Sequence, residues 1–279
     1  MGTLFTDYSL KVLDKQVKMS YQDKLNQRVS TNIKEGRWSA ETTLDHFALV
    51  NYALPLARLR PLIPARFGIP TYEVNDELCA FISAVPFIDR DFHFPHVYPS
   101  PRYHFGQINY RAYITDKETG EDVVWFFGTV LGSHWYNLPR RLWKMPWYYG
   151  DFSTSFHYDH KDGYQTYKIN IDSVWGKTRI ELKDTAEAVT TAEGFDSISQ
   201  MKLFLTHPIQ GFYYRTNGKI GTYRVWHPEM RLTNAVGEYL YFEPFENLKL
   251  LSREEMRYPH SVFICPEILF RVELPPREV

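Results

Sequence analysis

Hydrophobic and polar residues alternate through the middle of the chain in the pattern typical of antiparallel strands. A period-two run spans Tyr103–Tyr113, a turn follows at Asp116–Asp122, and a second apolar run occupies Val123–Leu131. This order predicts a β-hairpin with a longer loop, in which Gly120 supplies the positive φ that such a loop needs.

The other apolar runs predict many closely spaced strands and few helices. We expect strands at 46–53, 71–74, 78–85, 147–158, 164–173, 178–183, 208–215, 219–227 and 261–272. We expect helices within 4–35, over 55–63 and 134–143, and from 195 onward, where Asp196 or Ser197 serves as the N-cap. The pattern favours a mainly β (α+β) protein whose curved antiparallel sheet closes on itself. Without a linker or a repeat, it predicts an N-terminal helical extension over 1–45 and one domain over 46–279.

Composition excludes several classes of function. Thirty-two basic and 33 acidic residues give a net charge of -1, and the basic residues are scattered, so we expect no nucleic-acid partner. No apolar run approaches the roughly 20 residues of a membrane helix, and no signal peptide is evident, which predicts a cytoplasmic protein without a membrane partner. Cys79 and Cys265 lie far apart and are expected to be reduced and buried.

The common catalytic and phosphate-binding motifs are missing, including G-x-S-x-G, the P-loop and H-E-x-x-H. The aromatic segment from Phe87 to Phe105 contains three histidines and two aspartates, and it reads as a proline-rich loop. Because no helix fixes the histidine spacing, an ordered loop that caps a pocket or a subunit contact explains them better than a metal site. We therefore expect no metal and no cofactor.

Polar side chains on the first strand of the central hairpin are the first candidate site. Gln107, Asn109 and Arg111 share one face of a strand that is otherwise rich in aromatic residues. Polar groups in such a setting either pair within the core or face a ligand, and the sequence leaves both alternatives open.

A second group of candidates follows that strand. Arg140 and Arg141 are adjacent cations in a segment rich in tryptophan and tyrosine, and they either bind an anion or form surface ion pairs. His134 is the candidate for proton transfer, with a structural role as the alternative. Trp125 is expected either in the core or against a ligand.

The chain resembles an uncharacterised bacterial family of the acetoacetate decarboxylase-like superfamily. The resemblance covers most of residues 46–275 and rests on the order and spacing of several segments. These segments are ALVNYALPLARLRPLIP, AFISAVPF, GQINYRAYI, VVWFFGTVLGSHWYNLPRRLWKMPWYYGDF, FLTHPIQGFYYRTNGKIGTYRVWHP and ILFRVELPP. It implies a cone-like barrel around an internal cavity, with peripheral helices, and by analogy a homo-oligomer.

The resemblance also implies a change of chemistry. Acetoacetate decarboxylases use a Schiff-base lysine beside a second lysine, and the matching segment here ends in Arg140-Arg141. Arginine stays protonated and cannot act as an amine nucleophile, so Schiff-base decarboxylation is not expected, and Lys144 is a weak substitute. Gln107 stands where the family usually carries a glutamate, and His207 where it tends to carry an acid.

Two functions remain open at this stage. The first is the binding of a small anionic metabolite, a carboxylate or keto acid, in a central cavity, with acid–base catalysis as the possible activity. The second is a non-catalytic binding or assembly protein in which aromatic side chains fill the cavity.

Overall fold

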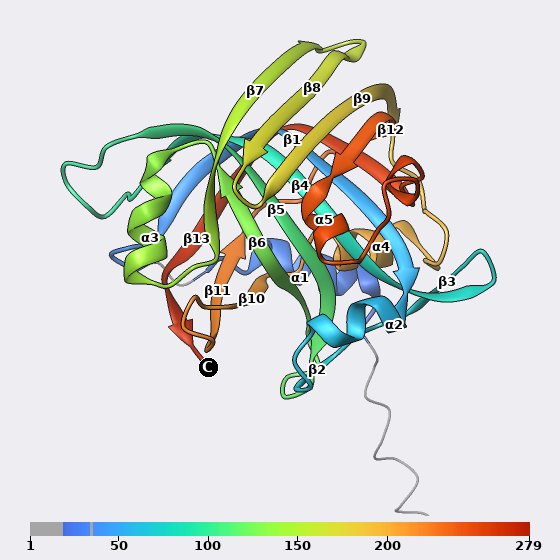
Figure 1. Cartoon of the computed structure of the whole chain (residues 1–279), viewed down its shortest axis with the longest axis horizontal. Helices are drawn as coiled ribbons and strands as arrows, with labels where there is room; N and C mark the ends of the chain where they lie inside the picture. Colours follow the sequence, from blue (N-terminus) through green and yellow to red (C-terminus); the bar gives the residue numbers. More distant parts are fainter. Residues whose placement is uncertain (1–18, 34–35) are drawn as a thin grey trace, which may run out of the picture.

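The computed structural model describes residues 19–33 and 36–279, and strands account for most of it (Figure 1). The strands are β1 Ala40–Pro55, β2 Phe67–Gly68, β3 Tyr72–Val74, β4 Glu77–His93, β5 Tyr103–Asp116, β6 Asp122–Leu131, β7 Trp147–Asp159, β8 Gly163–Ser173, β9 Gly176–Ala188, β10 Gln210–Tyr214, β11 Ile220–Trp226, β12 Thr233–Phe242 and β13 Ser261–Glu278. The helices are α1 Tyr21–Ser30, α2 Leu56–Leu59, α3 Asn137–Leu142, α4 Ile198–Leu205 and α5 Glu243–Asn247, with short 3-10 turns at Arg60–Leu62, His134–Tyr136 and Glu255–Arg257.

All the strands belong to one sheet that closes on itself. The order is β11-β10-β6-β7-β8-β9-β12-β13-β1-β4-β5-β2, with β3 on β4, and further pairings join β11 to β13 and β6 to β5. The sheet therefore forms two rings that share β13, β1, β4, β5 and β6. The predicted mainly β, closed and curved sheet is confirmed, although β6 pairs in parallel with both β7 and β10.

The two faces of the shared strands serve two different cores. One core fills the larger ring, and from β5 it takes Ile108, Tyr110 and Ala112. The other lies inside the smaller ring of β1, β4, β5, β6, β10, β11 and β13, and it takes Tyr113 from the opposite face of β5. Because successive strand residues point to opposite faces, the polar residues of β5 lie on the side of the smaller ring.

Two strands are longer than the sequence predicts. β4 continues to His93, through residues predicted to be in the aromatic loop, because Phe87–Asp89 pair with β5. β13 passes through Pro266, which removes a backbone N–H that a strand would normally use. Pro266 lies opposite His46, the bulged residue between Asp45 and Phe47 of β1, where the ladder already has a gap.

Within the described residues, α1 covers Tyr21–Ser30 of the segment 4–35, in which one helix or two short ones were predicted. Ser20 caps α1 by accepting a hydrogen bond from the backbone N–H of Asp23, and Leu25 is buried where α1 packs on α4. The apolar positions at 10, 13 and 17 lie outside the described residues. β1 already begins at Ala40, inside the predicted 1–45 extension.

Both cysteines are buried free thiols. Among the described helices, none is long and apolar enough to cross a bilayer.

Candidate functional site

A cavity of about 110 Å³ lies inside the smaller ring. All seven strands of the ring contribute to its wall. Representative lining residues are Thr42 of β1, Asp89 of β4, Arg111 of β5, Phe126 of β6, Gly211 of β10, Tyr223 of β11 and Phe270 of β13. A single water molecule needs about 10–15 Å³ of such cavity volume, so the cavity has room for a small organic ligand.

The polar face of β5 forms one wall of the cavity. Gln107, Asn109 and Arg111 all line it, and they lie opposite Phe87, Val85 and Ser83 of β4. The Gln107 amide nitrogen donates to Asn109 Oδ1 at 3.1 Å, and Thr129 Oγ1 donates to the same oxygen at 2.7 Å. The sequence therefore singled out three residues that the structure brings together in one cavity.

Arg111 is a partly buried cation held by neutral groups. Its Nε donates to Ser83 Oγ at 3.1 Å, and its Nη2 donates to Tyr113 Oη at 3.2 Å and to the Leu205 carbonyl at 3.0 Å. These contacts use the Nε and Nη2 hydrogens. Nη1 has no hydrogen-bond partner, and the guanidinium forms no ion pair, among residues 19–33 and 36–279. One charged donor group thus remains available at the cavity.

Buried neutral groups surround the Arg111 end. His227 lines the cavity, and its ring nitrogens lie 2.8 Å from the Pro228 carbonyl and 3.0 Å from the Thr206 carbonyl. Burial lowers the pKa of His227, the two carbonyl contacts oppose this, and Arg111 adds to the lowering, so that the pKa is about 4. At neutral pH this ring is uncharged, so Arg111 is the cation of this end.

The neighbouring His207 has a defined tautomer. The Thr206 hydroxyl donates to the Lys202 carbonyl at 2.7 Å, so it accepts from His207 Nδ1, which lies 2.7 Å away. The buried Nε2 is therefore an acceptor, and it has no partner within the described chain. Burial lowers the pKa of His207 to about 2, which keeps the ring neutral.

A buried carboxyl group lies elsewhere along the cavity. Asp89 is 3% exposed, and its Oδ1 accepts a 3.0 Å hydrogen bond from Thr42 Oγ1. Its Oδ2 is buried and has no partner among the described side chains or backbone groups. Burial raises the pKa of Asp89 to about 7, and the Thr42 hydrogen bond opposes this only in part. The group therefore changes protonation close to neutral pH.

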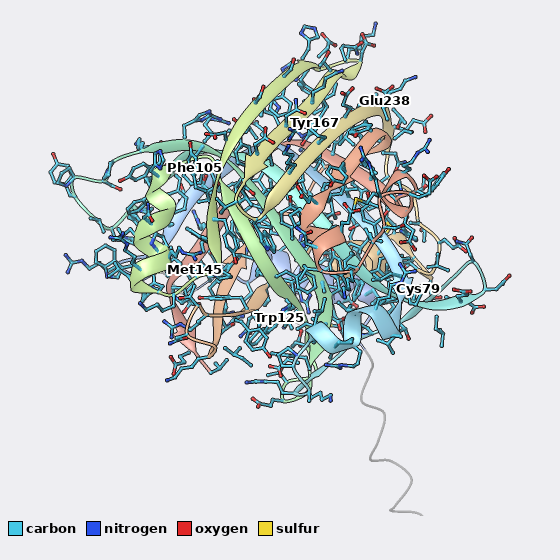
Figure 2. The ribbon with its side chains drawn as sticks, viewed as in Figure 1. Cys79, Phe105, Trp125, Met145, Tyr167 and Glu238 are labelled. Atoms are coloured by element: carbon cyan, nitrogen blue, oxygen red, sulfur yellow. The ribbon has the colours of Figure 1, made fainter. Side chains whose placement is uncertain are left out.

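Trp125 lies away from the cavity. It packs in the larger core, with its ring centroid 5.7 Å from that of Phe67 and 4.9 Å from that of Tyr214, near the β2 end of the sheet (Figure 2). Its partner across the β5–β6 ladder is Ala112, whose side chain belongs to the larger core as well. The core alternative holds for Trp125, and a ligand-binding role is not retained.

The residues after the hairpin also lie outside the cavity wall. Arg140 donates to the Trp147 carbonyl at 2.7 Å and stacks over Tyr148, with 5.1 Å from its guanidinium carbon to the ring centroid. Arg141 is exposed. His134 is exposed too, and it stacks on Tyr149 with 4.4 Å between centroids. None of the three lines the cavity, so anion binding by Arg140 and Arg141 and proton transfer by His134 remain predictions for a place outside it.

Within the described part of the chain, no lysine lines the cavity. Lys144 lies beyond α3 with a φ of 56°, and its carbonyl accepts from the Thr216 N–H at 2.8 Å. Neither Lys144 nor the arginine pair lines the cavity, so the structure offers no described amine for a Schiff base there.

Two residues that line the cavity, Asp89 and His227, were not predicted as site residues from the sequence. Asp89 was assigned to a loop because the apolar run ends before it, and only the strand pairing of β4 places it on the wall. His227 has no local motif at all. Across residues 19–33 and 36–279, no group of three or more His, Cys, Asp or Glu side chains is arranged to hold a metal ion.

Several solved structures share this fold. Acetoacetate decarboxylase from Legionella pneumophila aligns with a TM-score of 0.53 at 10% identity, covering 91% of this chain and 94% of that one. The enduracididine biosynthesis enzyme MppR complexed with pyruvate aligns with a TM-score of 0.55 at 10% identity, covering 89% and 92%. MppR complexed with the condensation product of pyruvate and imidazole 4-carboxaldehyde aligns with a TM-score of 0.57 at 9% identity, covering 89% and 91%.

These likenesses establish an acetoacetate decarboxylase-like fold. Among curated proteins, none matches the chain significantly. The model of the DUF2071 family, described as an uncharacterized conserved protein, matches residues 41–268, and the chain belongs to this family.

Proposed function

We propose that the cavity binds a small carboxylate, of the keto-acid class, and that Arg111 is its anchor. The observation that carries the proposal is a cavity-lining guanidinium whose protein partners are all neutral. Its Nη1 has no hydrogen-bond partner in the described chain, while Nε and Nη2 are already held in place.

A cation in such a place costs free energy unless an anion compensates it. Removing a charge from water is unfavourable by several kcal/mol in real proteins, and neutral hydrogen-bond partners offset only part of this. A ligand carboxylate at Nη1 would provide the opposite charge and a charge-assisted hydrogen bond. Burial keeps His227 neutral, and Arg111 is the only lysine or arginine side chain of the described residues that lines the cavity, so no second lining cation competes for the anion.

The fold relatives support the same ligand class. MppR has been solved with pyruvate, and the Legionella relative is an acetoacetate decarboxylase. Both names concern keto acids, which carry the carboxylate that Arg111 is suited to bind. The absence of lysine from the described lining favours binding or acid–base chemistry without a Schiff base.

The second function, an assembly protein with a filled cavity, has less support. The space inside the smaller ring is open at about 110 Å³, and Trp125 packs in the other core. An open cavity lined by an uncompensated cation suits a ligand better than a purely structural interior.

Thermal unfolding and calorimetry with pyruvate and acetoacetate test the proposal. A ligand at one hundred times its Kd should stabilise the native state by about 2.7 kcal/mol, and the neutral methyl ester of pyruvate should not. Arg111→Met should abolish the effect. Arg140→Ala is the matched control, since Arg140 lies outside the cavity wall, and it should bind as the wild type does.

The comparison of the two arginine variants decides the assignment. Loss of binding in Arg140→Ala with retention in Arg111→Met would refute Arg111 as the anchor. A wild-type protein that binds neither keto acid nor any other carboxylate would refute the proposed function itself.

A further inference from the structure

The cavity has two chemically different ends, and Asp89 marks the second. Arg111 lies opposite Ser83 on the β4–β5 ladder and donates to its hydroxyl. Asp89 is six residues further along β4, and a strand rises about 3.3 Å per residue, so the two ends are separated by up to roughly 20 Å along the strand.

The charges of the two ends do not compensate each other. The pKa of Asp89 is set by burial and by Thr42, with no contribution from Arg111. Arg111 does influence His227 and Tyr223, which places those two groups at its own end. The guanidinium and the carboxyl group are thus separate binding features of one cavity.

The β4 side of the wall between the two ends is apolar. Val85 and Phe87 lie between Ser83 and Asp89 on the face that lines the cavity. Asn109 and Gln107 of β5 line the same stretch beside them, and the Asn109 side-chain oxygen already accepts two hydrogen bonds within the protein. A pyruvate-sized ligand held at Arg111 would leave most of this surface and the Asp89 end without contacts. Burial of a longer apolar body would contribute about 0.8 kcal/mol per methylene group in hydrophobic free energy.

The geometry points to an elongated ligand: a carboxylic acid whose carboxylate binds Arg111, whose apolar body lies along β4, and whose far end carries a hydroxyl or carbonyl group that hydrogen-bonds to Asp89. This rests on the proposed function and narrows its substrate class. The far-end group satisfies Asp89 Oδ2, a buried oxygen with no partner in the described chain.

A hydroxyl group suits Asp89 in either protonation state. The protonated carboxyl can donate to the ligand oxygen, and the carboxylate can accept from the ligand O–H. Thr42 fixes the carboxyl group from the other side by donating to Oδ1, so Oδ2 is held in one position. A terminal methyl group would instead leave Oδ2 buried without a partner, which is the more costly arrangement.

Calorimetry with pyruvate, octanoate and ω-hydroxyoctanoate tests this inference. The wild-type protein should bind octanoate more tightly than pyruvate, and ω-hydroxyoctanoate about three- to tenfold more tightly than octanoate, the effect of one added hydrogen bond. Asp89→Leu should remove the preference for the hydroxyl and keep the binding of octanoate. Asp89→Asn retains a hydrogen-bonding group of the same size and should keep part of the preference.

The outcomes separate this inference from the proposed function. If pyruvate binds through Arg111 but octanoate binds no better, or if Asp89→Leu keeps the full preference for the hydroxyl, the elongated ligand is refuted and the carboxylate site stands. If none of the three carboxylates binds the wild type, the carboxylate site fails as well. Unfolding midpoints of both Asp89 variants show whether each is folded.

Discussion

Replacing Asp89 by asparagine should make the protein more stable, and the gain should grow with pH. Burial raises the pKa of the folded-state carboxyl group from 3.8 to about 7. Between these values the folded protein holds a proton that the unfolded chain has released, so the stability of the wild type falls as pH rises. Asparagine does not titrate and therefore lacks this dependence.

The structure sets the magnitude. A raised pKa of about three units corresponds to about 4 kcal/mol in full, at 1.36 kcal/mol per unit. Much of that difference develops between pH 5 and pH 8, where the wild type should lose about 2–3 kcal/mol relative to Asp89→Asn. The Thr42 contact contributes little to this difference, because asparagine keeps an oxygen that can accept from the threonine hydroxyl.

Urea unfolding of both proteins at several pH values measures this difference directly. Asp159→Asn is the control, because Asp159 is exposed and accepts the N–H groups of Lys161 and Asp162, which lowers its pKa. The stability that Asp159 contributes is lost only as pH falls through that lowered pKa. Above pH 5 the free energy of unfolding of this variant should therefore change with pH in the same way as that of the wild type. If the Asp89→Asn curve is parallel as well, Asp89 is ionised normally and the description of a buried, unpaired carboxyl is incorrect.

Three further predictions concern stability. Gly150→Ala should destabilise the protein by about 1–3 kcal/mol in chemical unfolding, because the added Cβ would lie 2.5 Å from a methyl group of a β6 valine. Gly68→Ala is the control: its added Cβ would lie 3.6 Å from the nearest atom, so the free energy of unfolding should hardly change. Leu25→Ala should lower the free energy of unfolding by about 2 kcal/mol or more, because Leu25 is the buried side chain of α1 and only 1% exposed. Gln27→Ala, at an exposed position of the same helix, should not lower it. Equal unfolding midpoints of the two variants would show that α1 adds no stability. Burial lowers the pKa of His227 to about 4, so stability present above pH 6.5 should be lost as pH falls, by up to about 3 kcal/mol, and His227→Asn should show a shallower acid dependence in denaturant titrations.

Local pattern was sufficient for much of the fold. The period-two runs predicted the β5–β6 hairpin, and the apolar runs at 208–215 and 219–227 predicted the neighbouring strands β10 and β11, because both features depend on residues close in sequence. The polar face of β5 was visible for the same reason. Ser197 was a predicted N-cap and accepts from the Gln200 N–H in α4.

The Asp89 end of the cavity could not be predicted from the sequence, because it is formed by contacts between residues that are distant in sequence. Asp89 belongs to the wall only because β4 remains paired with β5 beyond its apolar run, and its hydroxyl partner Thr42 comes from β1. Arg140 and Arg141 were the more obvious cations in the sequence. Nothing local shows that α3 lies outside the wall, since that follows from how the chain passes between β6 and β7.

A strand bulge explains why Trp125 faces the larger core and not the cavity. On β6, Thr129 pairs with Asn109 and bonds its side chain, so a regular strand would place residues 127 and 125 on the cavity face too. The ladder instead shifts register between Tyr110 and Arg111, and the extra β6 residue lets Phe126 share the cavity face with Thr129 while Trp125 turns to the larger core. A bulge in β1 has the same effect.

The β1 bulge lies at His46, which has a φ of 52°, and it places Leu44 and Phe47 together on the cavity wall although they are three residues apart. A one-residue insertion inverts the faces of a strand, since the side-chain period is two. Both bulges lie in strands shared by the two rings, where each face must meet a different core. They place Phe47 and Phe126 on the cavity wall, so the shape of the cavity follows from two irregularities that alternation alone cannot predict.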